Sequence, residues 1–183
     1  MKLSQARIAP LTEAEWTDEQ RTVLEPVQRE GRVYNVRATL SQHWEATKKF
    51  GVWSSHIMGD TSTLVPRERE ILILRIGWLC QAEYEWGQHV WYGKKAGLTD
   101  EEIARIKAGP DAEGWAAFDA SLLRAVDELH ADAFISDTTW AALSERYTTQ
   151  QCMDVVFTVG QYNMVSMALN TFGVQLDKGV KGF

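Results

Sequence analysis

The amino-acid sequence predicts an all-α protein, and three features of its residue pattern support that fold class. Hydrophobic residues recur at helical spacings of three and four along most of the chain, and strict alternation of polar and apolar residues is never sustained. Helix-capping sequences are frequent, whereas the Asn-Gly and Asp-Gly pairs typical of β-hairpin turns do not occur. The length of 183 residues, without a linker or repeat, is typical of a single domain spanning residues 1–183.

Capping and termination signals place the expected helices in order. Thr17–Gln20 is a capping box that opens the first helix, and Gly31 is its expected end. Pro66 suits the first turn of the third helix. Thr99–Glu102 is a second capping box, which opens the fifth helix, and Gly109-Pro110 is the expected end of that fifth helix. The expected helices cover residues 17–30, 36–58 with a break near Gly51, 66–80, 83–96, 99–107, 114–131, 138–146 and 148–170.

The last of these segments is long enough to span a bilayer, because no charged residue lies between Val155 and Leu176. It also contains amide and hydroxyl side chains, such as Gln161, Asn163 and Ser166, which are costly in hydrocarbon. We therefore expect a central buried helix rather than a membrane span.

Charge and cysteine content exclude several classes of protein. The formal net charge is −6, and the densest basic pairs, Lys48-Lys49 and Lys94-Lys95, fit solvated helix faces, so no nucleic-acid partner is expected. Cys80 and Cys152 lie outside any CxxC or Cys/His cluster, so we expect neither a disulfide nor a metal site. The amino terminus lacks the apolar core of a signal peptide, which predicts a cytoplasmic protein. We also expect no membrane partner and no cofactor.

Candidate acid/base residues lie in the third and fourth expected helices. Glu85 and His89 are spaced i,i+4, so the carboxylate can orient the imidazole and raise its basicity, as a general base requires. The same spacing is also typical of a helix-stabilising polar pair. Glu70 is either a surface partner of neighbouring arginines or a functional acid. A metal site with Glu85 and His89 as ligands would need a further histidine, which no spacing specifies.

Motifs around these residues resemble the carboxymuconolactone decarboxylase family, whose superfamily contains the AhpD-type alkylhydroperoxidases. The segments that carry the resemblance are Pro66–Arg75, Ala82–Trp86, His89, Ala96–Ile103, Asp127–His130 and Gly160–Met164. The resemblance implies an AhpD-like helical bundle of about seven or eight helices, with its core motif at residues 66–103. It also implies assembly as a homo-oligomer, a trimer or a hexamer.

The peroxidase branch of the superfamily uses a glutamate, a CxxC pair and a histidine. In this chain those positions hold Glu70, Ala82, Glu85 and His89, so both thiols are missing. Cys80 lies two residues from the first thiol position and has no resolving partner, so peroxide reduction by a cysteine pair is excluded. The resemblance leaves Glu70, Glu85 and His89 as the expected catalytic residues.

These observations predict a cofactor-independent acid/base enzyme, a lyase, decarboxylase or isomerase that acts on a small carbonyl or lactone acid. The residues expected to bind this small-molecule substrate are Arg75, Tyr84, Trp86, Tyr92 and Tyr162. The alternative is a non-catalytic, oligomeric protein of the same fold that binds a small ligand. A thiol antioxidant that acts through Cys80 is the least favoured interpretation, and His130 is expected to cap a helix terminus.

Overall fold

The computed structural model describes residues 2–28 and 31–183, and in that part of the chain it is all-helical with no β-strand. This confirms the predicted fold class. The α-helices are α1 (Asp18–Leu24), α2 (Asn35–Leu40), α3 (Trp44–Met58), α4 (Pro66–Leu79), α5 (Glu83–Lys95), α6 (Asp100–Ala108), α7 (Ala117–Asp132), α8 (Asp137–Ser144) and α9 (Thr149–Phe172). Short 3-10 helices occupy Glu13–Glu15, Glu25–Val27 and Ser41–His43.

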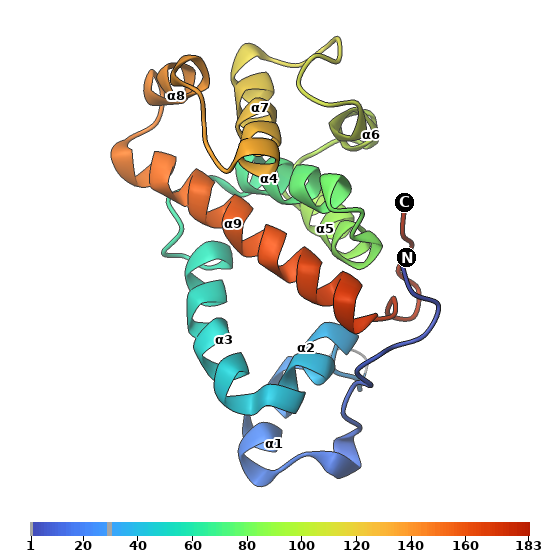
Figure 1. Ribbon diagram of the computed structural model, residues 1–183. Coiled ribbons are helices and arrows are strands. Elements are labelled where there is room, and N and C mark those ends of the chain that lie inside the picture. Colours follow the sequence, from blue (N-terminus) through green and yellow to red (C-terminus); the bar gives the residue numbers. More distant parts are fainter. Residues whose placement is uncertain (1, 29–30) are drawn as a thin grey trace.

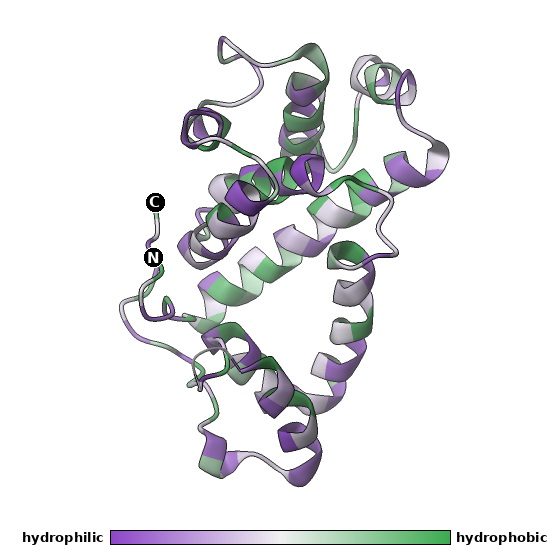
Figure 2. Ribbon diagram, turned by 180° about the vertical axis from the view of Figure 1, so that it is seen from behind, coloured by the Kyte–Doolittle hydropathy of each residue, from purple (hydrophilic) through white to green (hydrophobic). Residues whose placement is uncertain are grey.

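Helix α4 is the centre of the molecule and packs against α5, α7 and α9 (Figure 1). Its apolar residues Ile71–Leu74 and Ile76 have no exposed surface, as expected for a helix that is hydrophobic on all sides. In Figure 2, hydrophobic and hydrophilic residues alternate along most of the surrounding helices, as packing on one face requires. Helix α4 also buries charged residues, each of which needs a partner inside the protein.

The amino-terminal helices form a separate group. Helices α1, α2 and α3 lie on the opposite side of α9 from α6, α7 and α8 (Figure 1). The chain before them is attached to the end of α9, because the backbone N–H groups of Arg7 and Ile8 both donate to the carbonyl of Phe172, at 2.8 and 3.1 Å. Helix α9 therefore joins the amino-terminal group to the α4 core.

Most of the predicted helix boundaries are correct within a few residues, and the exceptions have local causes. The first helix ends at Leu24, because Pro26 has no N–H and opens a 3-10 turn. Its predicted end at Glu30 lies outside the described residues. The predicted break near Gly51 is wrong, since Gly51 lies within α3, and the chain bends instead at the 3-10 turn Ser41–His43.

Helix α7 begins at Ala117 rather than at the predicted residue 114. Gly109 and Gly114 adopt positive φ angles of 97° and 94°, so the chain between them is not helical. The indole N–H of Trp115 also donates to the carbonyl of Gly109 at 3.1 Å, which fixes this loop ahead of the helix.

Among the described residues, none of the helices has both the length and the apolar character that a membrane crossing needs. Helix α9 instead buries polar residues, including Asp154 and Gln161, against the rest of the protein.

Candidate functional site

Glycines lie in the contact between α4 and α5, and at Gly93 a larger residue would be crowded. A Cβ atom on Gly93 of α5 would lie 3.2 Å from Leu74 Cδ1 and 3.9 Å from Glu70 Cβ. On α4, a Cβ atom on Gly77 would lie 3.6 Å from Glu85 Cγ. The close contact brings the carboxylates of both helices to one place in the core.

At this place His89 lies between two carboxylates. Its Nδ1 is 2.7 Å from Glu70 Oε2, and its Nε2 is 2.9 Å from Glu85 Oε1. Glu70, Glu85 and His89 are 1%, 5% and 6% exposed, so water competes little for these contacts. Both ring nitrogens can donate at once only when the imidazole is protonated.

The electrostatic environment favours that protonated form. Burial by itself disfavours the charged ring, but the negative charges and hydrogen bonds of Glu70 and Glu85 outweigh it and raise the pKa of His89 to about 10. His89 therefore holds its proton at neutral pH. This corrects the expectation of a general base near neutrality, because the spacing predicted one carboxylate partner and the fold provides two.

Two tyrosines of the predicted set lie beside the imidazole. The ring centroid of Tyr162, from α9, is 4.9 Å from that of His89 in an edge-on arrangement, and the ring of Tyr92 is 5.3 Å away. Burial, followed by the charges of Glu85 and Glu70, raises the pKa of Tyr162 well above its ordinary value. Its phenol is therefore neutral at physiological pH and can donate a hydrogen bond.

Arg69 is a charged group of this site that the sequence argument missed. Its Nε lies 3.8 Å from Glu70 Oε1, its side chain is 10% exposed, and its positive charge acts on Tyr162. Sequence reasoning considered Arg69 only as a surface partner of Glu70. The available signal was its position, next to a predicted catalytic residue on a helix that is apolar on all sides.

Arg75, predicted to bind substrate, is engaged by protein groups in this structure. Its guanidinium forms a two-point ion pair with Asp127, at 2.6 and 2.8 Å. The same group donates to the carbonyls of Ile106 and Lys107, at 2.9 and 3.0 Å. These contacts fix α4 to α6 and α7 and leave no free face for a substrate carboxylate.

Tyr84 and Trp86, also predicted to bind substrate, contact the carboxyl-terminal segment of the chain. The Tyr84 hydroxyl donates to Asp177 and accepts from the backbone N–H of Val36, which joins the carboxyl-terminal segment to α2. The Trp86 ring packs edge-on against Trp78 and Phe183, at centroid distances of 5.8 Å in both cases. Successive residues of α5 therefore face different neighbours, which helical geometry requires.

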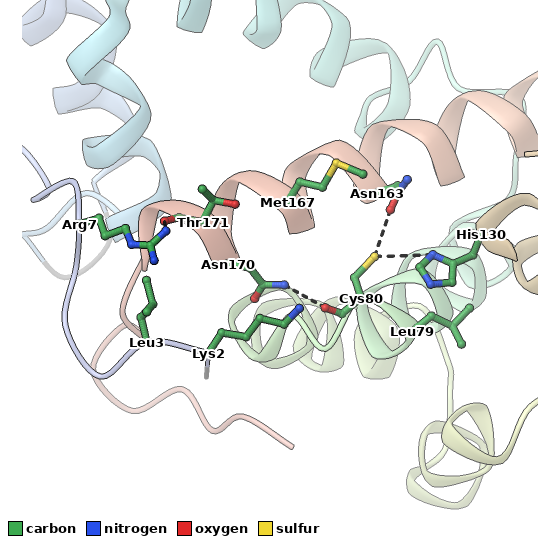
Figure 3. Close-up of a pocket in the computed structure, with 10 residues that line it drawn as sticks. All are labelled: Lys2, Leu3, Arg7, Leu79, Cys80, His130, Asn163, Met167, Asn170 and Thr171. Carbon is green, nitrogen blue, oxygen red and sulfur yellow. Dashed lines mark hydrogen bonds between the residues drawn. The ribbon is translucent and has the colours of Figure 1, made fainter.

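A pocket of about 530 Å³ lies elsewhere, between the amino-terminal segment, the end of α4 and α9 (Figure 3). The Cys80 thiol donates to Asn163 Oδ1 at 3.1 Å, and His130 Nδ1 lies 4.0 Å from the sulfur. Burial raises the pKa of Cys80, which keeps it a thiol and lowers its reactivity. His130, expected at a helix terminus, is in the last turn of α7 and faces this pocket.

The other histidines do not gather at His89. His56 bonds Asp154 and Thr61, and His130 faces Cys80. Within the part of the chain that the structure describes, no group of three or more His, Cys, Asp and Glu residues is arranged to hold a metal ion.

Comparison with known proteins places the fold. The model of the carboxymuconolactone decarboxylase family matches residues 39–128. None of the curated proteins matches the chain in sequence. A crystal structure described as an alkylhydroperoxidase AhpD core, an uncharacterised peroxidase-related protein from Ralstonia eutropha JMP134, has a TM-score of 0.83 at 18% identity and covers 94% of this chain and 93% of that one.

Two further solved structures are similar over nearly the whole chain. An uncharacterised peroxidase-related protein from Silicibacter sp. TM1040 has a TM-score of 0.83 at 16% identity, covering 97% of this chain and 96% of that one. A variant of the debrominase Bmp8 in complex with 2,3,4-tribromopyrrole has a TM-score of 0.73 at 14% identity, covering 96% and 94%. At such low identities the likeness shows a common AhpD-like fold.

Proposed function

We propose that this chain, whose residues 39–128 match the model of the carboxymuconolactone decarboxylase family, is a cofactor-independent acid/base enzyme, a lyase, decarboxylase or isomerase acting on a small carbonyl or lactone acid. One observation carries this proposal: the His89 imidazole lies between the buried carboxylates of Glu70 and Glu85. Such a cluster stores one proton in a place from which bulk water is largely excluded.

The chemistry follows from that stored proton. Loss of carbon dioxide from an acid leaves an enolate, which needs a proton on carbon. His89 supplies this proton in two transfers: Nε2 gives it to Glu85, and the resulting carboxylic acid delivers it to the carbon, which leaves a neutral imidazole and a carboxylate. Glu70 keeps Nδ1 protonated and the ring in place, and the ring is then recharged from solvent. Glu85 is the more exposed of the two carboxylates, at 5% against 1%, so we assign it the contact with substrate. A positioned acid of this kind contributes roughly 10²- to 10⁴-fold to a rate.

The experiment is a turnover assay of the purified protein on a panel of lactone acids and β-keto acids, with His89→Gln and Glu70→Gln as separate variants. We expect turnover of at least one compound and a fall of at least about tenfold in each variant. Turnover that persists unchanged in both variants would overturn the assigned roles. A homo-oligomer, trimer or hexamer, is part of the same proposal and is measured by the mass of the native protein.

The pocket around Cys80 supports the second candidate, a non-catalytic protein that binds a small ligand. Its volume of about 530 Å³ is in the range of small-molecule sites, and the residues that line it do not include Glu70, Glu85 or His89. Calorimetric titration of the same acids separates the candidates. Binding that is abolished by Asn163→Leu and unaffected by His89→Gln, without turnover of any compound, would favour the binding protein.

A further inference from the structure

Helix α4 carries three arginines whose side chains are largely enclosed, and two of them are fully engaged. Arg67 forms a two-point pair with Asp119, at 3.1 and 2.8 Å, and also contacts Glu102. Arg75 is held by Asp127 and by two backbone carbonyls. Both arginines connect α4 to neighbouring helices, and their guanidinium groups are occupied by protein partners.

Arg69 differs from both. Its side chain is only 10% exposed, yet its Nε has no hydrogen-bond partner among the residues that the structure describes. The nearest carboxylate oxygen, Glu70 Oε1, is 3.8 Å away, which is beyond hydrogen-bonding distance. A buried guanidinium N–H without an acceptor is costly, so this Nε is a donor that a bound anion could satisfy.

We propose that Arg69 is the anchor for a carboxylate of the substrate. This inference rests on the proposed function, and it narrows the substrate to molecules that carry a carboxylate beside the carbon to be protonated. The planar guanidinium can match a carboxylate at two points, which is the geometry that such an anchor requires.

The position of Arg69 fits this role. It follows Glu68, whose carboxylate is occupied by Arg146 and by the Tyr147 hydroxyl, and it precedes Glu70, which holds His89. Because Arg69 Nε lies 3.8 Å from Glu70 Oε1, a carboxylate bound to Arg69 would lie next to the cluster of Glu70, Glu85 and His89.

The balance of charges around His89 also permits an anion to bind beside Arg69. With His89 protonated, the positive charges of His89 and Arg69 balance the negative charges of Glu70 and Glu85. The site then does not repel a single incoming carboxylate, as an unbalanced pair of glutamates would.

Calorimetric titration tests this without requiring turnover. The probes are acetate, benzoate and 5-oxotetrahydrofuran-2-carboxylate, each compared with its neutral carboxamide. We expect the wild-type protein to bind at least one carboxylate saturably and at least about tenfold more tightly than the amide, because a charge-assisted pair is lost with the amide. In Arg69→Met the carboxylate affinity falls by at least about tenfold and the preference disappears. Arg69→Lys retains part of the preference.

Arg37→Met is the matched control, because it removes an exposed positive charge from α2 and should leave the titration unchanged. Circular dichroism and native mass establish that each variant keeps its fold and subunit number. Equal carboxylate affinity in wild type and Arg69→Met would overturn the proposal, and so would a wild-type protein that binds none of the three carboxylates. If the carboxylate preference depends on Arg69 but no compound is turned over, the proposed function fails and the assignment of Arg69 stands.

Discussion

Two histidine–carboxylate clusters in the described part of the chain differ in burial and in partners, and the difference distinguishes the proposed reactive site from a structural contact. In the first, His89 is 6% exposed and both its nitrogens face carboxylates. In the second, between α3 and α9, the His56 side chain is 32% exposed and bonds one carboxylate, Asp154 Oδ1, at 3.0 Å. The other His56 nitrogen bonds a neutral hydroxyl, Thr61 Oγ1, at 3.1 Å.

The carboxylates of the two clusters are also satisfied differently. Asp154 accepts hydrogen bonds from the backbone N–H and the hydroxyl of Thr63, at 2.8 and 2.7 Å. Asp154 therefore fixes the loop before α4, and His56 completes an arrangement that is already satisfied. Glu70 and Glu85 instead have the imidazole as their shared partner. A mobile proton is the central feature of the first cluster and is incidental to the second.

The largest expected difference is in turnover. With a substrate identified from the panel, His89→Gln should reduce turnover by roughly 10²- to 10⁴-fold, because the stored proton is removed. His56→Gln should change it less than about twofold, since that ring does not contact the cluster. Steady-state rates of both variants test this, and equal losses would contradict the distinction between the clusters.

The pH dependence of stability should have opposite signs in the two clusters. The pKa of His89 is raised from 6.5 to about 10, so its contribution is fully present below about pH 6.5 and is lost as the pH rises toward 10. The expected loss is roughly a few kcal/mol. Denaturant unfolding between these pH values should show it, and His89→Gln should flatten the alkaline side of the curve.

Asp154 acts at the acid end. Burial opposes ionisation, but hydrogen bonds from Thr63 and His56 outweigh it and lower the pKa of Asp154 below its usual value of 3.8. Its contribution is therefore present above the ordinary aspartate pKa and is lost as the pH falls through the depressed value. Asp154→Asn should destabilise the protein by about 1–3 kcal/mol at neutral pH, because the Thr63 donors lose an anionic acceptor. Chemical denaturation measures this, and turnover should be nearly unchanged.

The smallest effect should come from His56→Gln. Its contact with Asp154 is partly exposed, and even a charged pair in such a place contributes at most about 1 kcal/mol. Thermal unfolding should shift by a few degrees at most. A larger loss would show that the second cluster depends on its histidine and not mainly on Thr63.

The sequence predicted the part of the site that lies within a single helix. The contact between Glu85 and His89 follows from i,i+4 spacing within one helix. Glu70 reaches His89 from another helix, 19 residues earlier, and was identified through the family motif, not through periodicity. The two capping boxes likewise predicted the starts of α1 and α6, because capping is a local interaction.

Long-range partners explain what the sequence did not predict. The sequence argument chose Arg75 as the substrate anchor, and only the packing of α7 shows that Asp127, 52 residues away, occupies it. The contacts of Tyr84 with Asp177 and of Trp86 with Phe183 depend on the carboxyl-terminal segment, which no motif places. Side-chain periodicity gives the face of a helix but not the neighbour that this face meets.

The protonation state of His89 tests the central claim most directly. Nuclear magnetic resonance of the protein with ¹⁵N-labelled histidine reports whether one or both ring nitrogens carry a proton. The account predicts an imidazolium at pH 8 that titrates near pH 10 in the wild-type protein and at a lower pH in Glu70→Gln. A neutral His89 ring at pH 8, or a titration unaffected by Glu70→Gln, would contradict it.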